Sequence, residues 1–234
     1  MPQIESNMIE TAPIAEMLRV TKFYEGPHGG SAALRDVSFA ARPGEMILLL
    51  GPSGSGKTTF LTLLAGLQRP TSGEVHLFGK CTESYSHKEI QTIRAKRIGF
   101  IFQTFHLVES LTVLQNVMMV KRFAGSKHEE AKKSSMVFLK RFEVDHLADS
   151  YPTKISQGEK QRVAVARALV NGADLIFADE PTGSLATRQG MEIVEFLRKC
   201  VVEENRCVII TSHDERIVPY ADKVLHLQDG EVKK

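Results

Sequence analysis

The stretch Met46–Thr59, MILLLGPSGSGKTT, decides the fold of this chain. Its apolar residues Met46–Leu50 suit a buried strand, because they form a short run that is followed at once by a Gly-Pro pair. Residues 51–58, GPSGSGKT, fit the pattern G-x-x-x-x-G-K-[ST] at every fixed position. The apolar residues from Phe60 onward suit a helix. The stretch therefore predicts a strand, a phosphate-binding loop and a helix, in that order.

The residue types of this loop match the chemistry of a nucleotide phosphate site. Glycines let backbone N–H groups approach an anion, and the N-terminus of the following helix also favours negative charge. Lys57 would reach the β- and γ-phosphates, and the hydroxyl of Thr58 would bind Mg²⁺. The loop residues expected to contact the nucleotide are Gly51, Pro52, Ser53, Gly54, Ser55, Gly56, Lys57, Thr58 and Thr59. The alternative is a glycine- and serine-rich turn with a chance lysine, and the strand and helix on either side argue against it.

A second apolar run, Leu175–Ala178, ends in two acids, Asp179 and Glu180. In open α/β sheets ligands bind at the C-terminal edge of the strands, so both carboxylates are expected to face a ligand. Asp179 fits the acid that holds Mg²⁺ in phosphate-loop enzymes, and Glu180 is then placed to orient or deprotonate the attacking water. An Asp-Glu pair after a strand is common, so this interpretation depends on the presence of Lys57 and Thr58.

The composition is that of an ordinary globular protein. The chain has 234 residues, of which 42% are hydrophobic and 25% charged, and its net charge is +2 with no long basic run. A nucleic-acid partner is therefore not expected. Three cysteines without a C-x-x-C pair argue against a disulfide framework or a zinc site and favour a reducing compartment. No apolar run is long enough to cross a membrane, so any role at a membrane is expected to need a partner.

The order of the predicted elements is that of an α/β chain with a mainly parallel sheet. Residues 1–15 mix polar residues with proline and form the expected flexible leader, which lacks the apolar region of a signal peptide. Residues 16–234 form the expected single domain, in which the block at about 86–160 is mostly helical. Strand-like segments near the N-terminus are expected at residues 17–24, 33–40 and 74–78.

Further motifs follow the phosphate loop in a fixed order. They are Gln103 at the end of a predicted strand, ISQGEKQR at residues 155–162, Asp179-Glu180, Ser184-Leu185-Ala186 and His213. Together with the phosphate loop, this ordered set resembles the ATP-binding-cassette (ABC) ATPases over about residues 16–231. ISQGEKQR is similar to the family's signature LSGGQ(Q/K)QR, and its Ser156 and Glu159 also fit the capping box of a helix N-terminus.

The resemblance implies a phosphate-loop core, an N-terminal antiparallel β part and an inserted α-helical subdomain. It also implies that ATP is hydrolysed with Mg²⁺ by a homodimer. In such a dimer Ser156 and Gly158 of one subunit would contact the γ-phosphate that the other subunit holds.

The resemblance gives roles to further single residues. His213 would hold the γ-phosphate and the attacking water, so it joins Lys57 and Glu180 as a catalytic residue. Gln103 would sense Mg²⁺ and link the helical subdomain to the core. Tyr24 matches the aromatic residue that stacks on adenine.

The partner implied by the resemblance is an integral-membrane permease, with the ATPase at the cytoplasmic face of the inner membrane. The segments LTVLQNVMM, ADEPTGSL and 211–230 resemble the ATPases of lipoprotein-release, macrolide-efflux and heterocyst-glycolipid exporters. Export of a lipid, lipoprotein or hydrophobic compound is therefore expected, and a periplasmic adaptor would fit such a system. The alternative is a regulatory ATPase of the cell-division type, which signals through a membrane partner. The permease is expected to dock around residues 102–114, with Leu107 and Val108 as exposed members.

Two positions depart from the family pattern. Gln157 replaces the first glycine of the signature, where a side chain would be strained if the backbone needs a positive φ. Ala186 replaces the usual aspartate of the D-loop, which removes a carboxylate from the dimer interface. Neither change touches Lys57, Glu180 or His213, so hydrolysis is expected, with altered coupling between the two sites.

Overall fold

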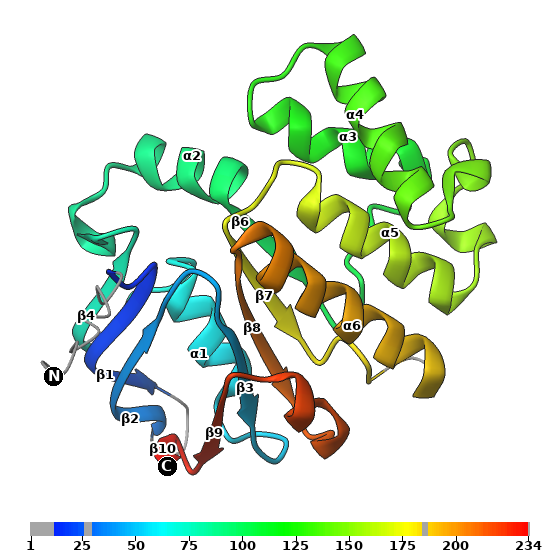
Figure 1. Ribbon diagram of the computed structural model, residues 1–234. Helices are drawn as coiled ribbons and strands as arrows, with labels where there is room; N and C mark the ends of the chain where they lie inside the picture. The colour runs from blue at the N-terminus through cyan, green and yellow to red at the C-terminus, as the bar shows by residue number, and fades with distance from the viewer. Residues whose placement is uncertain (1–11, 26–29, 184–186, 234) are drawn as a thin grey trace, which may run out of the picture.

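The larger sheet lies at the centre of the molecule (Figure 1). The computed structural model describes residues 12–25, 30–183 and 187–233. In this part of the chain the sheet order is β10 (Glu231–Lys233), β9 (Lys223–Gln228), β3 (Met46–Leu50), β8 (Cys207–Ser212), β7 (Leu175–Asp179) and β6 (Ile98–Ile101). Neighbouring strands run parallel except for the β9–β10 pair. The mainly parallel sheet predicted from the sequence is therefore confirmed.

The strand β3 shows why the larger sheet needs a cover on both faces. All of its residues are buried, as expected for a central parallel strand. Because side chains alternate along a strand, Met46, Leu48 and Leu50 enter one apolar core while Ile47 and Leu49 enter another. The first core contains residues of α5 (Gln157–Leu169) and α6 (Thr187–Glu204), and the second contains residues of α1 (Lys57–Leu64).

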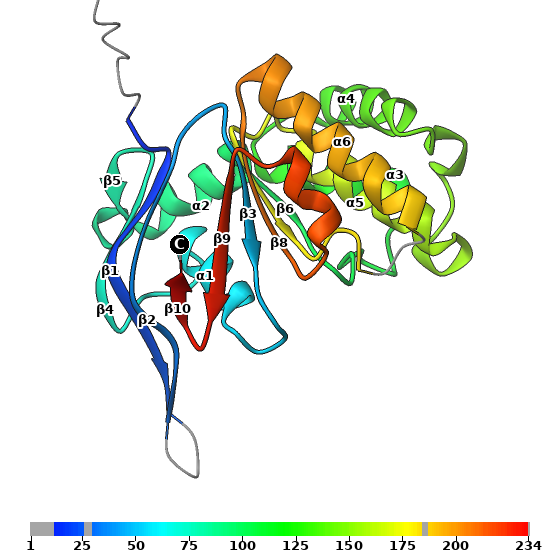
Figure 2. The same cartoon turned by 60° about the horizontal axis from the view of Figure 1, so that its bottom comes forward.

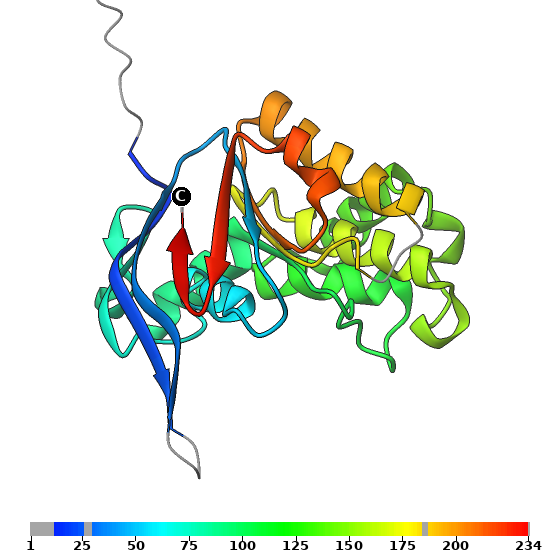
Figure 3. The same ribbon diagram turned by 90° about the horizontal axis from the view of Figure 1, so that it is seen from below.

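A smaller, antiparallel sheet packs beside α1 and completes the second core. Its order is β2 (Ser31–Ala41), β1 (Ala15–Tyr24), β4 (Ser72–Leu77) and β5 (Lys80–Cys81). Figures 2 and 3 show this sheet on one side of the larger sheet and the helical part on the other. The antiparallel β part is thus present as expected, and β1 begins at Ala15, the last residue of the expected leader.

The helical part consists of α3 (Val113–Phe123), α4 (His128–Arg141) and α5, which pack on one another. We expected helical structure over about residues 86–160. Within that range α2 (His87–Arg97) is a helix, but β6 pairs with β7 as a strand of the larger sheet. The mutually packed helices therefore begin after β6. Short 3₁₀ helices are η1 (Thr82–Ser84), η2 (Asp145–Leu147), η3 (Pro152–Lys154) and η4 (Glu215–Tyr220).

The burial of Phe177 gives a test of this core. Its side chain is 0% exposed on β7, whereas Phe123 at the end of α3 is 74% exposed. Phe177→Ala should lower the free energy of unfolding by about 3–5 kcal/mol, because it leaves a cavity in the packed core. Phe123→Ala should change it by less than about 0.5 kcal/mol. Chemical denaturation of both variants measures the difference, and equal losses would contradict the packing described here.

Candidate nucleotide site

The loop between β3 and α1 needs glycine at two positions, because its backbone adopts positive φ angles there and passes close to another segment. Gly54 and Gly56 have φ angles of 79° and 106°, which side chains disfavour. A Cβ atom on Gly56 would also lie 2.3 Å from the backbone oxygen of Ala33. The predicted order of strand, loop and helix is confirmed.

A cavity of about 610 Å³ opens beside this loop. Its size falls in the range of sites for small molecules and cofactors. It is lined by Ala33, Ser53, Gly54, Gly56, Lys57, Thr58, Thr59, Gln103, Asp179, Glu180 and His213. Segments far apart in the sequence therefore meet at the C-terminal edge of β3 and β7, where ligands bind in open α/β sheets.

The side chain of Lys57 is buried and held by the loop itself. Its Nζ donates hydrogen bonds to the backbone oxygens of Gly51, at 2.7 Å, and Pro52, at 3.1 Å. The same Nζ lies 3.3 Å from Oε1 of Glu180. Gly51 and Pro52 thus contribute their carbonyls to this site, and Ser55 is buried beside them.

Asp179 accepts two side-chain hydrogen bonds at the end of β7. Thr58 Oγ1 donates to Asp179 Oδ2 over 2.9 Å, and Thr211 Oγ1 donates to Oδ1 over 2.6 Å. Thr211 stands opposite Asp179 in the parallel pairing of β7 with β8. Hydroxyl and carboxylate oxygens are the ligands that Mg²⁺ prefers, so Thr58 and Asp179 fit this ion.

Glu180 is buried between the side chains of Lys57 and His213. Its Oε2 lies 2.9 Å from Nδ1 of His213, and its Oε1 faces Lys57. Its φ of 48° is uncommon for a residue with a side chain, and such backbone conformations cluster at functional sites. The backbone N–H of Glu180 donates to the backbone oxygen of Thr211 over 3.0 Å, which holds this conformation in place.

Tyr24 is not among the residues that line the cavity. It stands at the end of β1 with 40% of its surface exposed. Its hydroxyl donates to Oε1 of Gln68 over 2.6 Å, and Nζ of Lys22 lies 5.2 Å from its ring centre. In this conformation the ring is exposed, and its role in binding a base stays a prediction.

Ser156 and Gly158 also lie away from the cavity in the same chain. Ser156 caps the N-terminus of α5: Glu159 N donates to Ser156 Oγ over 3.4 Å, and Ser156 N donates to Glu159 Oε2 over 2.7 Å. The predicted capping box is confirmed. Gln157 is exposed and opens α5 without a positive φ, so the backbone strain considered for this position is absent. Ala186 and its neighbours Ser184 and Leu185 lie outside the described residues.

Comparison with known proteins decides the family. Residues 34–183 match the protein family described as ABC transporter. The chain belongs to this family. The resemblance drawn from the sequence, the predicted fold and the prediction of an ABC-type ATP hydrolase are thereby confirmed.

Among curated ABC proteins, two relatives show different chain organisations. The putative hemin import ATP-binding protein HrtA of Staphylococcus haemolyticus is 39% identical over 93% of this chain and 98% of its own length. The macrolide export ATP-binding/permease protein MacB of Hahella chejuensis is 34% identical over 94% of this chain. The matched region of this chain corresponds to 34% of the length of MacB.

Solved ABC structures agree with the fold. The ATP-binding cassette MJ0796, in a dimeric post-hydrolysis state bound to ADP and phosphate, has a TM-score of 0.88 at 35% identity, covering 94% of this chain and 97% of that one. A curated relative of that name comes from Methanocaldococcus jannaschii. CbiO1 of Clostridium perfringens has a TM-score of 0.81 at 30% identity, covering 95% of this chain and 88% of that one.

Sequence reasoning missed Arg167, which connects α5 to the segment after Gln103. Its guanidinium donates to the backbone oxygens of Phe105 and His106, both over 2.6 Å. These two residues have φ angles of 61° and 48°, so a tight turn is held here by a buried cation. Burial lowers the pKa of Arg167 to about 10. A charged residue inside the apolar run RVAVARAL was the available signal.

Asn116 holds the next part of the same segment. It is fully buried on α3, and its Nδ2 donates to the backbone oxygens of Val108, Leu111 and Thr112. Its Oδ1 accepts from Val108 N over 2.8 Å. Both polar atoms of its side chain therefore fix residues 108–112 against α3.

The position of Tyr24 outside the cavity makes its predicted role testable. If the ring stacks on the base, Tyr24→Ala should weaken ATP and GTP binding alike by about 1–3 kcal/mol, because stacking tolerates any base. Tyr24→Phe should be nearly silent, since it keeps the ring and loses only the exposed hydrogen bond to Gln68. Calorimetric titration of both variants with both nucleotides measures this. A large loss in Tyr24→Phe, or a loss for ATP alone, would exclude the stacking role.

Proposed function

We propose that this chain is the ATP-binding and ATP-hydrolysing subunit of a membrane transporter and drives a separate permease. The observation that carries this proposal is that five side chains suited to phosphoryl transfer line one cavity. They are Lys57, Thr58, Asp179, Glu180 and His213. Phosphoryl transfer depends mainly on positioning and charge stabilisation, which this arrangement supplies.

The phosphates of ATP are expected to lie against the glycine loop and the N-terminus of α1. Backbone N–H groups and the helix dipole favour anions at this place. Lys57 would then exchange its contacts with the Gly51 and Pro52 carbonyls for phosphate oxygens. This exchange would also remove Lys57 from Glu180, leaving that carboxylate available for chemistry.

Thr58 and Asp179 would hold the Mg²⁺ that accompanies ATP, with Gln103 as a further oxygen donor. The two oxygen atoms Thr58 Oγ1 and Asp179 Oδ2 already lie 2.9 Å apart. An ion bound there would neutralise charge on the phosphate oxygens. Thr211 keeps Asp179 oriented through the hydrogen bond to its other oxygen.

Glu180 would act as general base on the attacking water. Its carboxylate would take a proton as the water oxygen bonds to the γ-phosphorus and the bond between that phosphorus and the bridging oxygen breaks. The products are ADP and phosphate. The 2.9 Å contact with Nδ1 of His213 orients the carboxylate and leaves the other ring nitrogen available to the γ-phosphate.

A second copy of the chain would complete each ATP site. Ser156 and Gly158, which the family resemblance assigns to the γ-phosphate, do not line the cavity of their own chain. The dimeric MJ0796 cassette, 35% identical to this chain, supports such an arrangement. We therefore propose a homodimer in which the N-terminus of α5 faces the partner's phosphate loop.

An apolar groove offers the docking surface for the permease. It has a volume of about 300 Å³ and opens between α2, β6, α3 and α5. Its apolar wall includes the exposed Leu67 and the half-buried Phe100, Phe102 and Met119. Such a groove fits a short amphipathic helix of a membrane protein. Within the stretch 102–114 that the sequence argument put forward, Phe102 and His106 line the groove, whereas Leu107 and Val108 do not.

We infer that the cargo is a hydrophobic compound, lipid or lipoprotein and that it is exported. The name of MacB, a macrolide export protein, supports export, whereas HrtA is named for hemin import. No helix in the described part of the chain has the length and apolarity to cross a membrane. As the family resemblance implies, the ATPase would act at the cytoplasmic face of the inner membrane, attached to its permease, and a periplasmic adaptor would complete an export path. Directional transport of labelled candidates in vesicles carrying both subunits tests the cargo.

Replacement of Glu180 tests the catalytic assignment. Glu180→Gln should still bind ATP but should hydrolyse it about 10²–10⁴-fold more slowly, because the general base is lost. ATP should also make this variant accumulate as a dimer, which size-exclusion chromatography detects. Glu203→Gln, on the exposed face of α6, is the matched control and should keep full turnover. Near-normal turnover in Glu180→Gln would refute the assignment.

A pair of charge substitutions tests the docking groove. Leu67 lines the groove and is 47% exposed, whereas Val108 is 37% exposed outside it. Leu67→Glu should keep basal ATPase activity but lose permease association and permease-stimulated turnover. Val108→Glu should keep basal ATPase activity, permease association and permease-stimulated turnover. If Leu67→Glu retains permease binding and stimulation, the permease docks elsewhere.

A further inference from the structure

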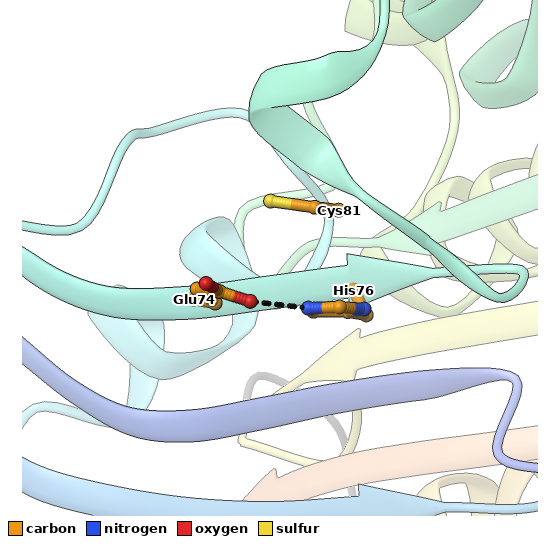
Figure 4. A group of neighbouring side chains, drawn as sticks. All are labelled: Glu74, His76 and Cys81. Atoms are coloured by element: carbon orange, nitrogen blue, oxygen red, sulfur yellow. Dashed lines mark hydrogen bonds and ion pairs between the residues drawn. The ribbon is translucent and has the colours of Figure 1, made fainter.

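A glutamate, a histidine and a cysteine meet on the smaller sheet, away from the nucleotide cavity. Figure 4 shows Glu74 and His76 on β4 with Cys81 of β5 beside them. One ligand atom from each of the three side chains lies within 4.8 Å of the other two. Glu74 is exposed, while His76 and Cys81 are half-buried, so the group is open to solvent on one side.

The pairing of the strands explains why these side chains share a face. Glu74 and His76 are two residues apart on β4, so both point away from the core that Val75 and Leu77 enter. Cys81 is the cross-strand partner of His76 in the β4–β5 pair. Side chains of directly paired residues stand next to each other on the same face of a sheet. The turn between β4 and β5 therefore fixes the cluster.

The ligand types favour zinc over magnesium or calcium. A thiolate and an imidazole are ligands for borderline-soft transition metals, and a carboxylate completes many zinc sites. Ligand atoms at about 2.0–2.3 Å from zinc lie roughly 3.3–3.8 Å from one another in a tetrahedral site. The observed spacing, within 4.8 Å, reaches this range by small side-chain rotations.

Strand pairing suggests Glu16 as the source of a fourth ligand. Glu16 of β1 is the cross-strand partner of His76 on the side opposite Cys81, so its carboxylate stands in the same row. Water would fill the position equally well, because the cluster is open to solvent. The nearest basic residue in sequence, Lys80, is engaged elsewhere: its Nζ lies 3.5 Å from Oε1 of Glu89 and above the ring of Tyr85.

We propose that Glu74, His76 and Cys81 form a binding site for a divalent transition-metal ion, with zinc as its occupant. The spacing of the cysteines argued against a zinc site in the sequence, because this cluster uses one cysteine and is assembled across two strands. The ion replaces the 2.8 Å hydrogen bond between Glu74 and His76. It also ties β5, which is only two residues long, to β4. The site is independent of ATP, since none of its residues lines the nucleotide cavity.

Zinc titration of the full chain tests the site. The metal-free protein is titrated with Zn²⁺ by calorimetry in excess Mg²⁺, which occupies oxygen sites such as Asp179. We expect one zinc ion per chain, with an affinity that falls at least tenfold in Cys81→Ser and in His76→Ala. Binding should raise the Tm by about 5–10 °C at a zinc concentration a hundred times the dissociation constant, because zinc binds only the folded site.

Cobalt gives an independent readout of the thiolate. Co²⁺ bound to the wild-type chain should show a sulfur-to-metal absorption band, and Cys81→Ser should abolish it although the buried Cys200 and Cys207 remain. His128→Ala, which removes an exposed histidine of α4, is the control and should bind zinc like the wild type. Zinc binding that is absent from the wild type, or unchanged in Cys81→Ser, would overturn the proposal and leave an ordinary Glu74–His76 hydrogen bond.

Discussion

The position of β8 between β3 and β7 is the constraint on which the nucleotide site depends. The phosphate loop follows β3, and the two acids lie at the end of β7. These two strands do not pair with each other, because β8 lies between them. β8 pairs in parallel with both strands and sets them at the same height, with Ser212 opposite Leu50 and Thr211 opposite Asp179. Because of this register, Lys57 and Glu180 reach ion-pair distance although they are far apart in the sequence.

Besides separating β3 from β7, β8 holds both acids in place through Thr211. Its hydroxyl binds the side chain of Asp179, and its backbone oxygen binds the N–H of Glu180. A shift of β7 by one residue would turn each of its side chains to the other face of the sheet. The apolar alternation of β7 between two cores opposes such a shift. Packing far from the chemistry therefore fixes which acid faces the loop.

The sequence could predict those parts of the site that are contiguous in the chain and in which residue types mark where a strand ends. The run MILLL before GPSGSGKT and the run LIFA before Asp-Glu both mark a strand end, and the ordered motifs placed Gln103 and His213 at the same cavity. The ion pair between Lys57 and Glu180 could not be predicted, because it depends on the strand order. The apolar groove was placed only in part for the same reason: its walls come from several elements that are separated in sequence.

Short or isolated elements account for most of the remaining differences between the sequence-based predictions and the structure. β5 and β10 have two and three residues, which is too short for a periodic pattern to show. β6 has a strand-like sequence, but nothing local indicates that it pairs with β7 and not within the helical part. Tyr24 matched a family position, yet its ring contacts are set by Lys22 and Gln68, which no motif contains.

Arg167 ties the C-terminal part of α5 to the turn at Phe105 and His106. Ser156, at the start of this helix, and Arg167, near its end, are separated by roughly 16 Å along the helix axis, at about 1.5 Å per residue. The first end belongs to the surface expected to meet a partner's ATP, and the other end holds the turn at Phe105 and His106 beside the apolar groove. Two short hydrogen bonds from one planar, buried guanidinium leave little freedom between helix and turn. A small rotation of α5 about its N-terminus would therefore displace this turn, which lines the groove through His106.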